Sequence, residues 1–173
     1  SYIKTQLNTE IYNFFKNPSH IQKKKGLEII HKIKNKNDVF NITYKNYKIG
    51  RFIYQSYCRE LLKKTVDIND KRLNYFVIEA ITALDNFLVF FKKFNVKKLY
   101  ISHVLFIRYG IPSIICKKKN IQINIIYPAD KDGYLKNLTR LNINNQLIQQ
   151  ERYWLFKKEY LKIKNKKELL KKS

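Results

Sequence analysis

The sequence predicts an α/β fold in which a Rossmann-like parallel sheet is flanked by helices, with helix-rich segments at both ends of the chain. Two runs rich in β-branched and aromatic residues, 98–102 and 121–127, are separated by a segment long enough for one helix. Apolar residues recur every three or four positions through most of the remaining chain, which is the period of amphipathic helices. The apolar content of 45% is sufficient for a packed core, so disorder is not expected.

The N-terminal part is predicted to be helical. The apolar period predicts a first helix over 1–16, which the break at Pro18 ends. Ser19 can cap a second helix that reaches the Asn- and Lys-rich stretch at 34–37. The next residues, 39–44, are predicted to form a strand or an extended segment.

Two further helices are expected in the middle of the chain. One has its apolar residues on a single face over 49–61 and ends at 63–65. The other covers 70–94, with Asp67 or Asn69 as its cap. Because apolar residues cover most of its circumference, we expect this helix to be buried between layers.

The clearest organisation is a βαβ unit. The strands at 98–102 and 121–127 are joined by a helix-length segment, 103–119, in which Gly110 and Pro112 are points of possible interruption. The strands should therefore be parallel and the crossover right-handed.

The remaining residues are predicted to form a long loop over 128–143 and a basic helix beyond it. No linker or internal repeat divides the chain, whose 173 residues have the length of one domain. We expect a single α/β domain over 1–173, made of an N-terminal helical segment, a Rossmann-like core and a C-terminal basic helix, at 1–37, 38–143 and 144–173.

The charge is strongly basic, with 36 Lys and Arg against 13 Asp and Glu, a net charge of +23. Of the basic residues, 30 are Lys and 6 are Arg, and the chain is also rich in other residues with AT-rich codons. Codon bias therefore explains much of the charge, and the low Arg content argues against sequence-specific reading of nucleic acid. The basic stretch 156–173 can lie on an anionic membrane surface or form a solvated tail.

Cysteine usage and hydropathy indicate a cytoplasmic protein. Cys58 and Cys116 have no metal-binding spacing, so no metal site is expected. Two reduced cysteines are the expectation, and a disulfide between them is the alternative that the sequence does not support. No signal peptide is visible, and the most apolar run, 75–94, is interrupted by Glu79 and Asp85. Each of these two carboxylates should be either paired with a base or functional.

The carboxyl ends of the two parallel strands are the expected ligand edge, because open α/β sheets bind ligands there. His103 follows the first strand and could act as a base or as a ligand for phosphate or sugar; packing or capping is the alternative. Asp130 follows the second strand, where it could bind a metal or a sugar or simply form a turn before Gly133.

The segment 47–59 is the second candidate region. Gly50 would permit close approach of a ligand or of another backbone, and Arg51 and Arg59 are two of the few arginines, which bind carboxylate or phosphate. No P-loop, GxGxxG or GxSxG motif is present, which excludes the corresponding nucleotide-binding and hydrolase signatures.

Two short motifs in these segments resemble those of a known protein family. The run 49–59 has the form IGxxIYxxYxR, and it precedes the segment 102–111 of the form SHxxxxxYGI. The two motifs resemble the N-terminal part of GT-B-type glycosyltransferases of bacterial surface-polysaccharide (capsule or lipopolysaccharide) biosynthesis, over roughly 39–135. Gln55 stands where that pattern has an acidic residue.

The resemblance implies an acceptor-binding domain that lies peripherally on the inner membrane and binds a glycan or a lipid-linked acceptor. It implies His103 as the catalytic base, with no metal and no cofactor. A nucleotide-sugar donor is expected only with a second GT-B domain, so this chain alone is not expected to transfer sugar. The expected binding residues are Gly50, Arg51, Tyr54, Tyr57, Arg59, Tyr109, Gly110 and Asp130.

Two other readings stay open from the residues alone. The first is a basic module that binds nucleic acid, which predicts binding that weakens steeply with salt. The second is a non-catalytic α/β interaction protein.

Overall fold

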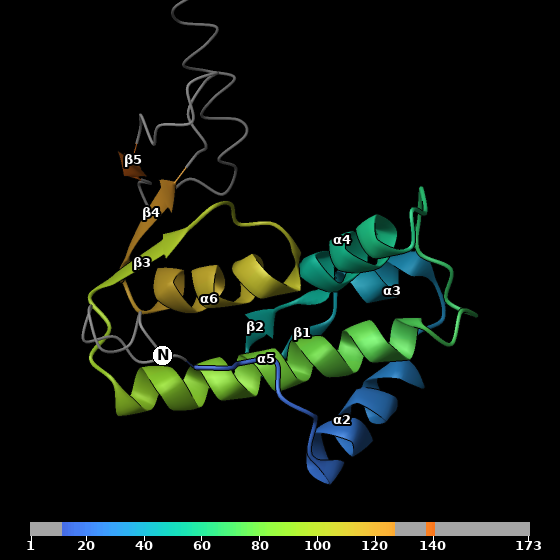
Figure 1. Ribbon diagram of the computed structural model, residues 1–173. Helices are drawn as coiled ribbons and strands as arrows, with labels where there is room; N and C mark the ends of the chain where they lie inside the picture. Colours follow the sequence, from blue (N-terminus) through green and yellow to red (C-terminus); the bar gives the residue numbers. More distant parts are fainter. Residues whose placement is uncertain (1–11, 127–137, 141–173) are drawn as a thin grey trace, which may run out of the picture.

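The computed structural model describes residues 12–126 and 138–140, which form helices and two small sheets (Figure 1). The elements in chain order are α2 (His20–Ile30), α3 (Lys36–Phe40), β1 (Thr43–Tyr44), β2 (Tyr47–Lys48), α4 (Gly50–Glu60), α5 (Leu73–Lys93), β3 (Lys98–Ile101), α6 (Phe106–Lys118), β4 (Gln122–Ile126) and β5 (Leu138–Arg140).

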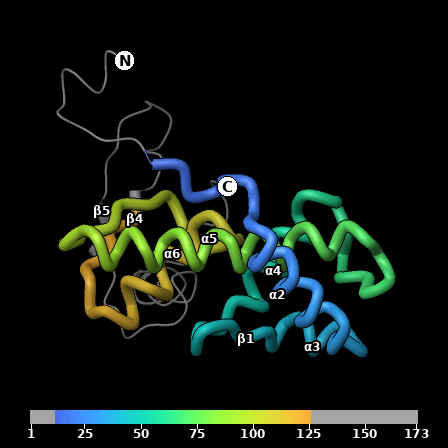
Figure 2. The backbone as a smooth tube through the Cα atoms, turned by 90° about the horizontal axis from the view of Figure 1, so that it is seen from below, coloured from blue at the N-terminus to red at the C-terminus, as the bar shows by residue number. Residues whose placement is uncertain are grey.

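Helix α5 is the centre of the fold. It runs the length of the described structure, with α2, α4 and α6 packed against it (Figures 1 and 2). Its buried residues extend from Leu73 to Phe91, which confirms the expected burial. Among the described helices, α5 is long and apolar enough to cross a membrane. The core helix of a soluble protein can have the same length and composition, and half of the most apolar window of α5 is buried inside the protein.

The predicted βαβ unit is confirmed. β3 and β4 pair in parallel, with Lys98 opposite Gln122 and Ile101 opposite Ile125, and α6 connects them. Helix α6 lies between this sheet and α5 (Figure 1). It continues through Pro112, whose missing N–H removes one intrahelical hydrogen bond.

The sheet is smaller than an extended Rossmann-like sheet. The described residues contain one parallel pair, and β5 adds to β4 in the antiparallel direction, which the sequence did not indicate. The α/β class is therefore confirmed at the coarse level, as a mixed fold of helices and small sheets.

The expected helix at 1–16 is wrong for residues 12–16, which are not helical. Their aromatic side chains instead pack on the C-terminal half of α5, where the ring of Phe14 stacks on Phe87 at 4.0 Å between centroids. Asn86 donates a hydrogen bond from Nδ2 to the carbonyl oxygen of Phe14 at 2.8 Å. This side-chain and backbone contact with α5 holds the segment in place without a helix.

The strand expected at 39–44 is also largely wrong. Asn35 and Asp38 form a reciprocal capping box that starts the short helix α3, so Val39 and Phe40 are helical. Only Thr43 and Tyr44 are extended, and they pair with β2 across a tight turn.

The caps explain where the other helices begin. Ser19 and Gln22 form the capping box of α2, as the sequence predicted for Ser19, although α2 ends at Ile30. Helix α4 matches the predicted amphipathic segment. Neither Asp67 nor Asn69 caps α5. The predicted loop at 128–143 lies outside the described residues except for 138–140, and the predicted basic helix at 144–173 lies wholly outside them.

Candidate functional site

The candidate site lies where β3 ends and α6 begins, at the carboxyl edge of the parallel pair. The chain leaves β3 at Ile101 and enters α6 at Phe106, and His103 lies half-buried in the turn between them. The His103 ring contacts Tyr109 edge-on at 4.2 Å and Phe106 at 5.4 Å between ring centroids. His103 is therefore held between two aromatic rings of α6.

The backbone determines which nitrogen of His103 carries the proton. The N–H of Leu105 donates to His103 Nδ1 at 3.3 Å, and this bond requires an unprotonated Nδ1. Burial lowers the pKa of His103, and the charge of Arg59 lowers it further. The ring is thus neutral at neutral pH with its proton on Nε2, so Nε2 is a donor. A general base at Nε2 would first have to lose the hydrogen bond from Leu105.

The side chain of Phe106 contacts both His103 and helix α4. Its ring also contacts Arg59, whose guanidinium carbon lies 4.4 Å from the ring centroid. The backbone of Phe106 has a φ of 61°, the left-handed region that a bulky residue rarely adopts. The following N–H, that of Ile107, donates to the buried Oγ of Ser56 on α4 at 3.0 Å. Helix α4 therefore holds the first turn of α6 in place.

Helix α4 carries three polar residues along one side, and the last of them, Arg59, contacts Phe106. Arg51, Gln55 and Arg59 follow one another at intervals of four residues, which places them along one side of the helix. Oε1 of Gln55 is buried and accepts no hydrogen bond. The sequence marked Gln55 only as a departure from the motif, and no local pattern could reveal that its amide oxygen is unsatisfied.

The two glycines of the motifs make room for protein rather than for a ligand. A Cβ on Gly110 would lie 2.2 Å from the ring of Phe52, so Gly110 permits the close packing of α6 on α4. A Cβ on Gly50 would meet backbone atoms of residues 39–42. Of the two alternatives raised for Gly50, the structure shows close approach of another backbone.

The two tyrosines of α4 support the fold on other sides of that helix. Tyr57 is fully buried, and its hydroxyl donates to Asp70 Oδ2 at 2.8 Å. Tyr54 is half-buried and forms a 2.8 Å hydrogen bond with the hydroxyl of Thr65. Tyr57 therefore presents no ring face to a ligand. Asp130 lies outside the described residues.

The carboxylates of α5 have different surroundings. Asp85 accepts hydrogen bonds from Lys45 at 2.7 Å and from Gln22 at 3.2 Å, which confirms the expected pairing with a base. For Glu79, burial raises the pKa and the charge of Glu60 adds to that rise, while Arg108 opposes it. Among residues 12–126, no group of three potential metal ligands is present.

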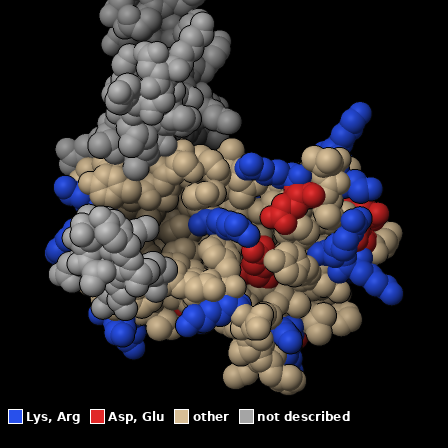
Figure 3. Space-filling view, in the orientation of Figure 1, with Lys and Arg blue, Asp and Glu red and all other residues tan. Residues whose placement is uncertain are grey.

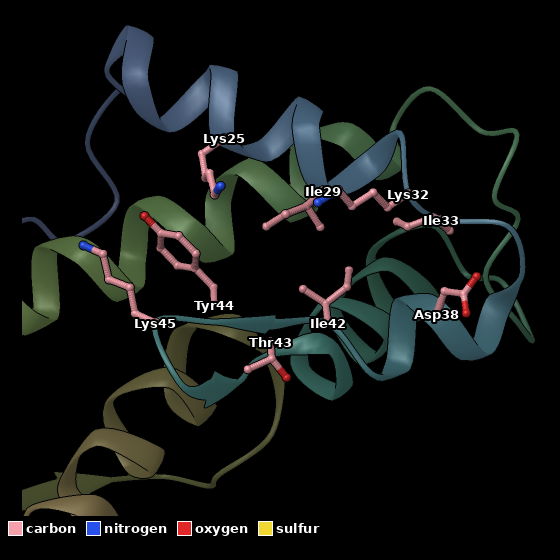
Figure 4. A pocket seen from close by; sticks show the side chains of 9 residues that line it. All are labelled: Lys25, Ile29, Lys32, Ile33, Asp38, Ile42, Thr43, Tyr44 and Lys45. Atoms are coloured by element: carbon pink, nitrogen blue, oxygen red, sulfur yellow. The ribbon is translucent and has the colours of Figure 1, made fainter.

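A separate pocket of about 450 Å³ lies between α2, α3 and the β1–β2 hairpin. Side chains of α2 and the hairpin face one another across it (Figure 4). It is lined by Lys25, Ile29, Lys32, Ile33, Asp38, Ile42, Thr43, Tyr44 and Lys45. Two of its lysines are already in ion pairs, Lys25 with Glu28 and Lys45 with Asp85. None of the predicted site residues lines it.

The structure thus brings together three of the predicted residues: Tyr109 contacts His103 directly, and the ring of Phe106 contacts both His103 and Arg59. Arg51 lies on the same side of α4 as Arg59, near its other end. Lys and Arg side chains are spread over the visible face of the molecule, and the acidic ones are few (Figure 3).

Comparison with protein-family models, with curated proteins and with solved structures finds no match to this chain.

Proposed function

We propose that the chain is the N-terminal, acceptor-binding domain of a GT-B-like glycosyltransferase that builds a bacterial surface polysaccharide. The observation that supports it best is the meeting of His103, Tyr109 and Arg59 at the carboxyl edge of the parallel pair. This is the edge at which open α/β sheets bind ligands. These three residues come from the two sequence motifs that resemble such enzymes.

The chemistry of the site suits a sugar. Tyr109 offers part of an aromatic ring, and Arg59 is exposed, rests on the ring of Phe106 and forms no ion pair among the described residues. Gln55, nearby on α4, has a buried amide oxygen without a hydrogen-bond donor, which becomes an acceptor for the sugar if the side chain turns outward. A sugar hydroxyl both donates and accepts, so it can bond to either kind of group.

Transfer of a sugar would require a second domain that binds the nucleotide-sugar donor. In this proposal the present chain binds the glycan or the lipid-linked acceptor and positions its hydroxyl beside His103. The hydrogen bond from Leu105 favours one of two roles for His103. His103 donates a hydrogen bond that orients the acceptor sugar, rather than taking a proton from it as a general base.

The basic surface gives the domain a second role, which is to hold it on the inner membrane. Each Lys or Arg near an anionic bilayer contributes about 1 kcal/mol of attraction. The excess of basic over acidic side chains on the face in Figure 3 is consistent with peripheral binding next to a lipid-linked acceptor.

The test is complementation in the source bacterium. The full-length gene is deleted and restored as wild type, His103→Ala or His31→Ala, and the extracted surface polysaccharide is compared. His31 is an exposed histidine at the end of α2 and serves as the matched control. We expect polysaccharide from the wild type and from His31→Ala, and loss of it from His103→Ala. Unchanged polysaccharide after gene deletion would refute the proposed function.

Tight binding to DNA or RNA that falls steeply as salt rises would instead identify a nucleic-acid-binding module. The same full chain can be tested for this at two salt concentrations.

A further inference from the structure

We propose that the site at the start of α6 binds an acidic sugar, whose carboxylate or phosphate accepts hydrogen bonds from His103 Nε2 and from Arg59 while a hydroxyl of the ligand donates to Gln55. This inference rests on the proposed function and names the class of its substrate. It follows from which donors and acceptors in this region have no partner.

The first donor is His103. Its Nδ1 is occupied by the Leu105 N–H, so the proton lies on Nε2. Within residues 12–126, no acceptor bonds to that Nε2–H. A neutral imidazole with a fixed tautomer is a directional donor, which suits an oxygen atom of an anion.

The second donor is Arg59. The ring of Phe106 contacts both Arg59 and His103, at 4.4 Å from the guanidinium carbon and 5.4 Å from the imidazole centroid, so the two side chains meet at one ring. Arg59 forms no ion pair with any described carboxylate, although Glu60 follows it in the sequence. A planar guanidinium seated on an aromatic ring retains its outward N–H donors for a carboxylate or a phosphate.

The charge balance favours an anion. The lowered pKa of His103 keeps the ring neutral, so Arg59 supplies the one full positive charge beside it. Burial and the charge of Glu60 raise the pKa of Glu79 against the opposing charge of Arg108, whose guanidinium lies over the ring of Phe15 at 5.6 Å. Arg108 is therefore engaged elsewhere, and Arg59 is the cation available to a ligand among the described groups around His103.

The acceptor is Gln55. It precedes Arg59 by four residues, so the two side chains are neighbours on the surface of α4. Its Oε1 is buried without a donor, and a buried carbonyl oxygen without a hydrogen bond is unfavourable. The oxygen is closed to solvent in this structure, so the Gln55 side chain has to turn outward before a hydroxyl next to the acidic group of a ligand can donate to it. A bare inorganic anion would not donate to it.

The experiment compares three matched sugars on the full chain at neutral pH: methyl glucuronide, methyl glucoside and the phosphorylated glucoside. Binding is followed by NMR on ¹⁵N-labelled protein, which also reports the tautomer of His103. We expect the acidic sugars to bind at least about tenfold more tightly than the glucoside, because only they accept charge-assisted hydrogen bonds. The stronger of the two acidic sugars identifies carboxylate or phosphate as the preferred group.

The variants separate the roles of the residues. Arg59→Gln should reduce the affinity for the acidic sugars to that for the glucoside, while Arg108→Gln, the matched control on α6, should not. His103→Gln keeps an N–H near the position of Nε2 and should retain most of the affinity, whereas His103→Ala should lose it. The backbone spectrum of each variant verifies that it is folded.

Equal affinity for the glucoside and the acidic sugars would overturn the inference, as would binding of none of them. A His103 proton found on Nδ1, or equal losses in His103→Gln and His103→Ala, would also overturn it. The complementation assay tests the proposed function separately. An enzyme whose acceptor is a neutral sugar would still make no polysaccharide with His103→Ala, although its isolated chain would show no preference for the acidic sugars.

Discussion

The replacement Gly50→Ala tests why this motif glycine is present. Gly50 is the first residue of α4, and its N–H and that of Ile49 both donate to the carbonyl oxygen of Ile42 at 3.0 Å. A Cβ at this position would lie 2.2 Å from the carbonyl oxygen of Val39 and 2.4 Å from that of Phe40. These neighbours are backbone atoms, which cannot rotate away as a side chain can.

The magnitude follows from the overlap. Non-bonded carbon and oxygen atoms are at their best at about 3.5 Å, so the backbone at the end of α3 would have to move by about 1 Å. Overpacking of this kind costs about 1–3 kcal/mol, and loss of a hydrogen bond to Ile42 adds about 1 kcal/mol. We therefore expect Gly50→Ala to lower the free energy of unfolding by about 3 kcal/mol and Tm by about 6–12 °C.

The assay is thermal unfolding followed by circular dichroism, with Gly26→Ala as the control. Gly26 lies inside α2, and a Cβ there would mainly press on Cγ1 of Ile78, a side-chain atom that yields at lower cost than backbone although Ile has few rotamers in a helix. Replacing a glycine inside a helix by alanine is also favourable by about 1 kcal/mol, so the control should be destabilised clearly less than Gly50→Ala. If Gly50→Ala unfolds at the same temperature as wild type and loses sugar binding instead, our reasoning is refuted and Gly50 serves a ligand.

Three further predictions concern buried groups. Tyr57→Phe removes the hydroxyl that donates to Asp70 and should lower the free energy of unfolding by about 1.5 kcal/mol in urea denaturation; an unchanged midpoint would contradict the role of that bond. Ser56→Ala leaves the buried N–H of Ile107 without an acceptor and should cost about 1–3 kcal/mol by the same measurement, with faster hydrogen exchange at Ile107. Burial raises the pKa of the Cys116 thiol to about 12, so Cys116 should resist alkylation by iodoacetamide at mildly alkaline pH until the protein is unfolded, and labelling of the native protein would contradict its burial.

The sequence predicted the elements whose signals are local. The Ser19 cap, the apolar face of α4, the apolar circumference of α5 and the pair of β-branched runs around α6 all depend on residues close together in the chain. Each of these predictions is confirmed, because tertiary packing reinforces the local preference there.

The failures have a common physical origin. Residues 12–16 have a helical period but are fixed by aromatic contacts to α5, more than 70 residues away in the sequence. At residues 39–40 the β-branched and aromatic content suggested a strand, yet the capping box of Asn35 and Asp38 forms a helix. In the first case a distant contact and in the second a cap outweighs the local preference.

The candidate site was predicted only in part. His103 and Arg59 could be named because a strand end and a rare arginine are visible in the sequence. The tautomer of His103, the position of the Phe106 ring and the unsatisfied oxygen of Gln55 depend on contacts between α4 and the start of α6. Such contacts have no signature in the chain order.

The left-handed backbone of Phe106 places stability and binding in conflict. A residue held in this conformation costs of order 1–3 kcal/mol, and Gly or Asn would adopt it more easily. Directed evolution for thermal stability alone should therefore favour Phe106→Gly or Phe106→Asn. Either replacement would remove the ring on which Arg59 and His103 rest, so variants selected only for heat resistance should lose affinity for the ligand, and selection for both properties should keep phenylalanine.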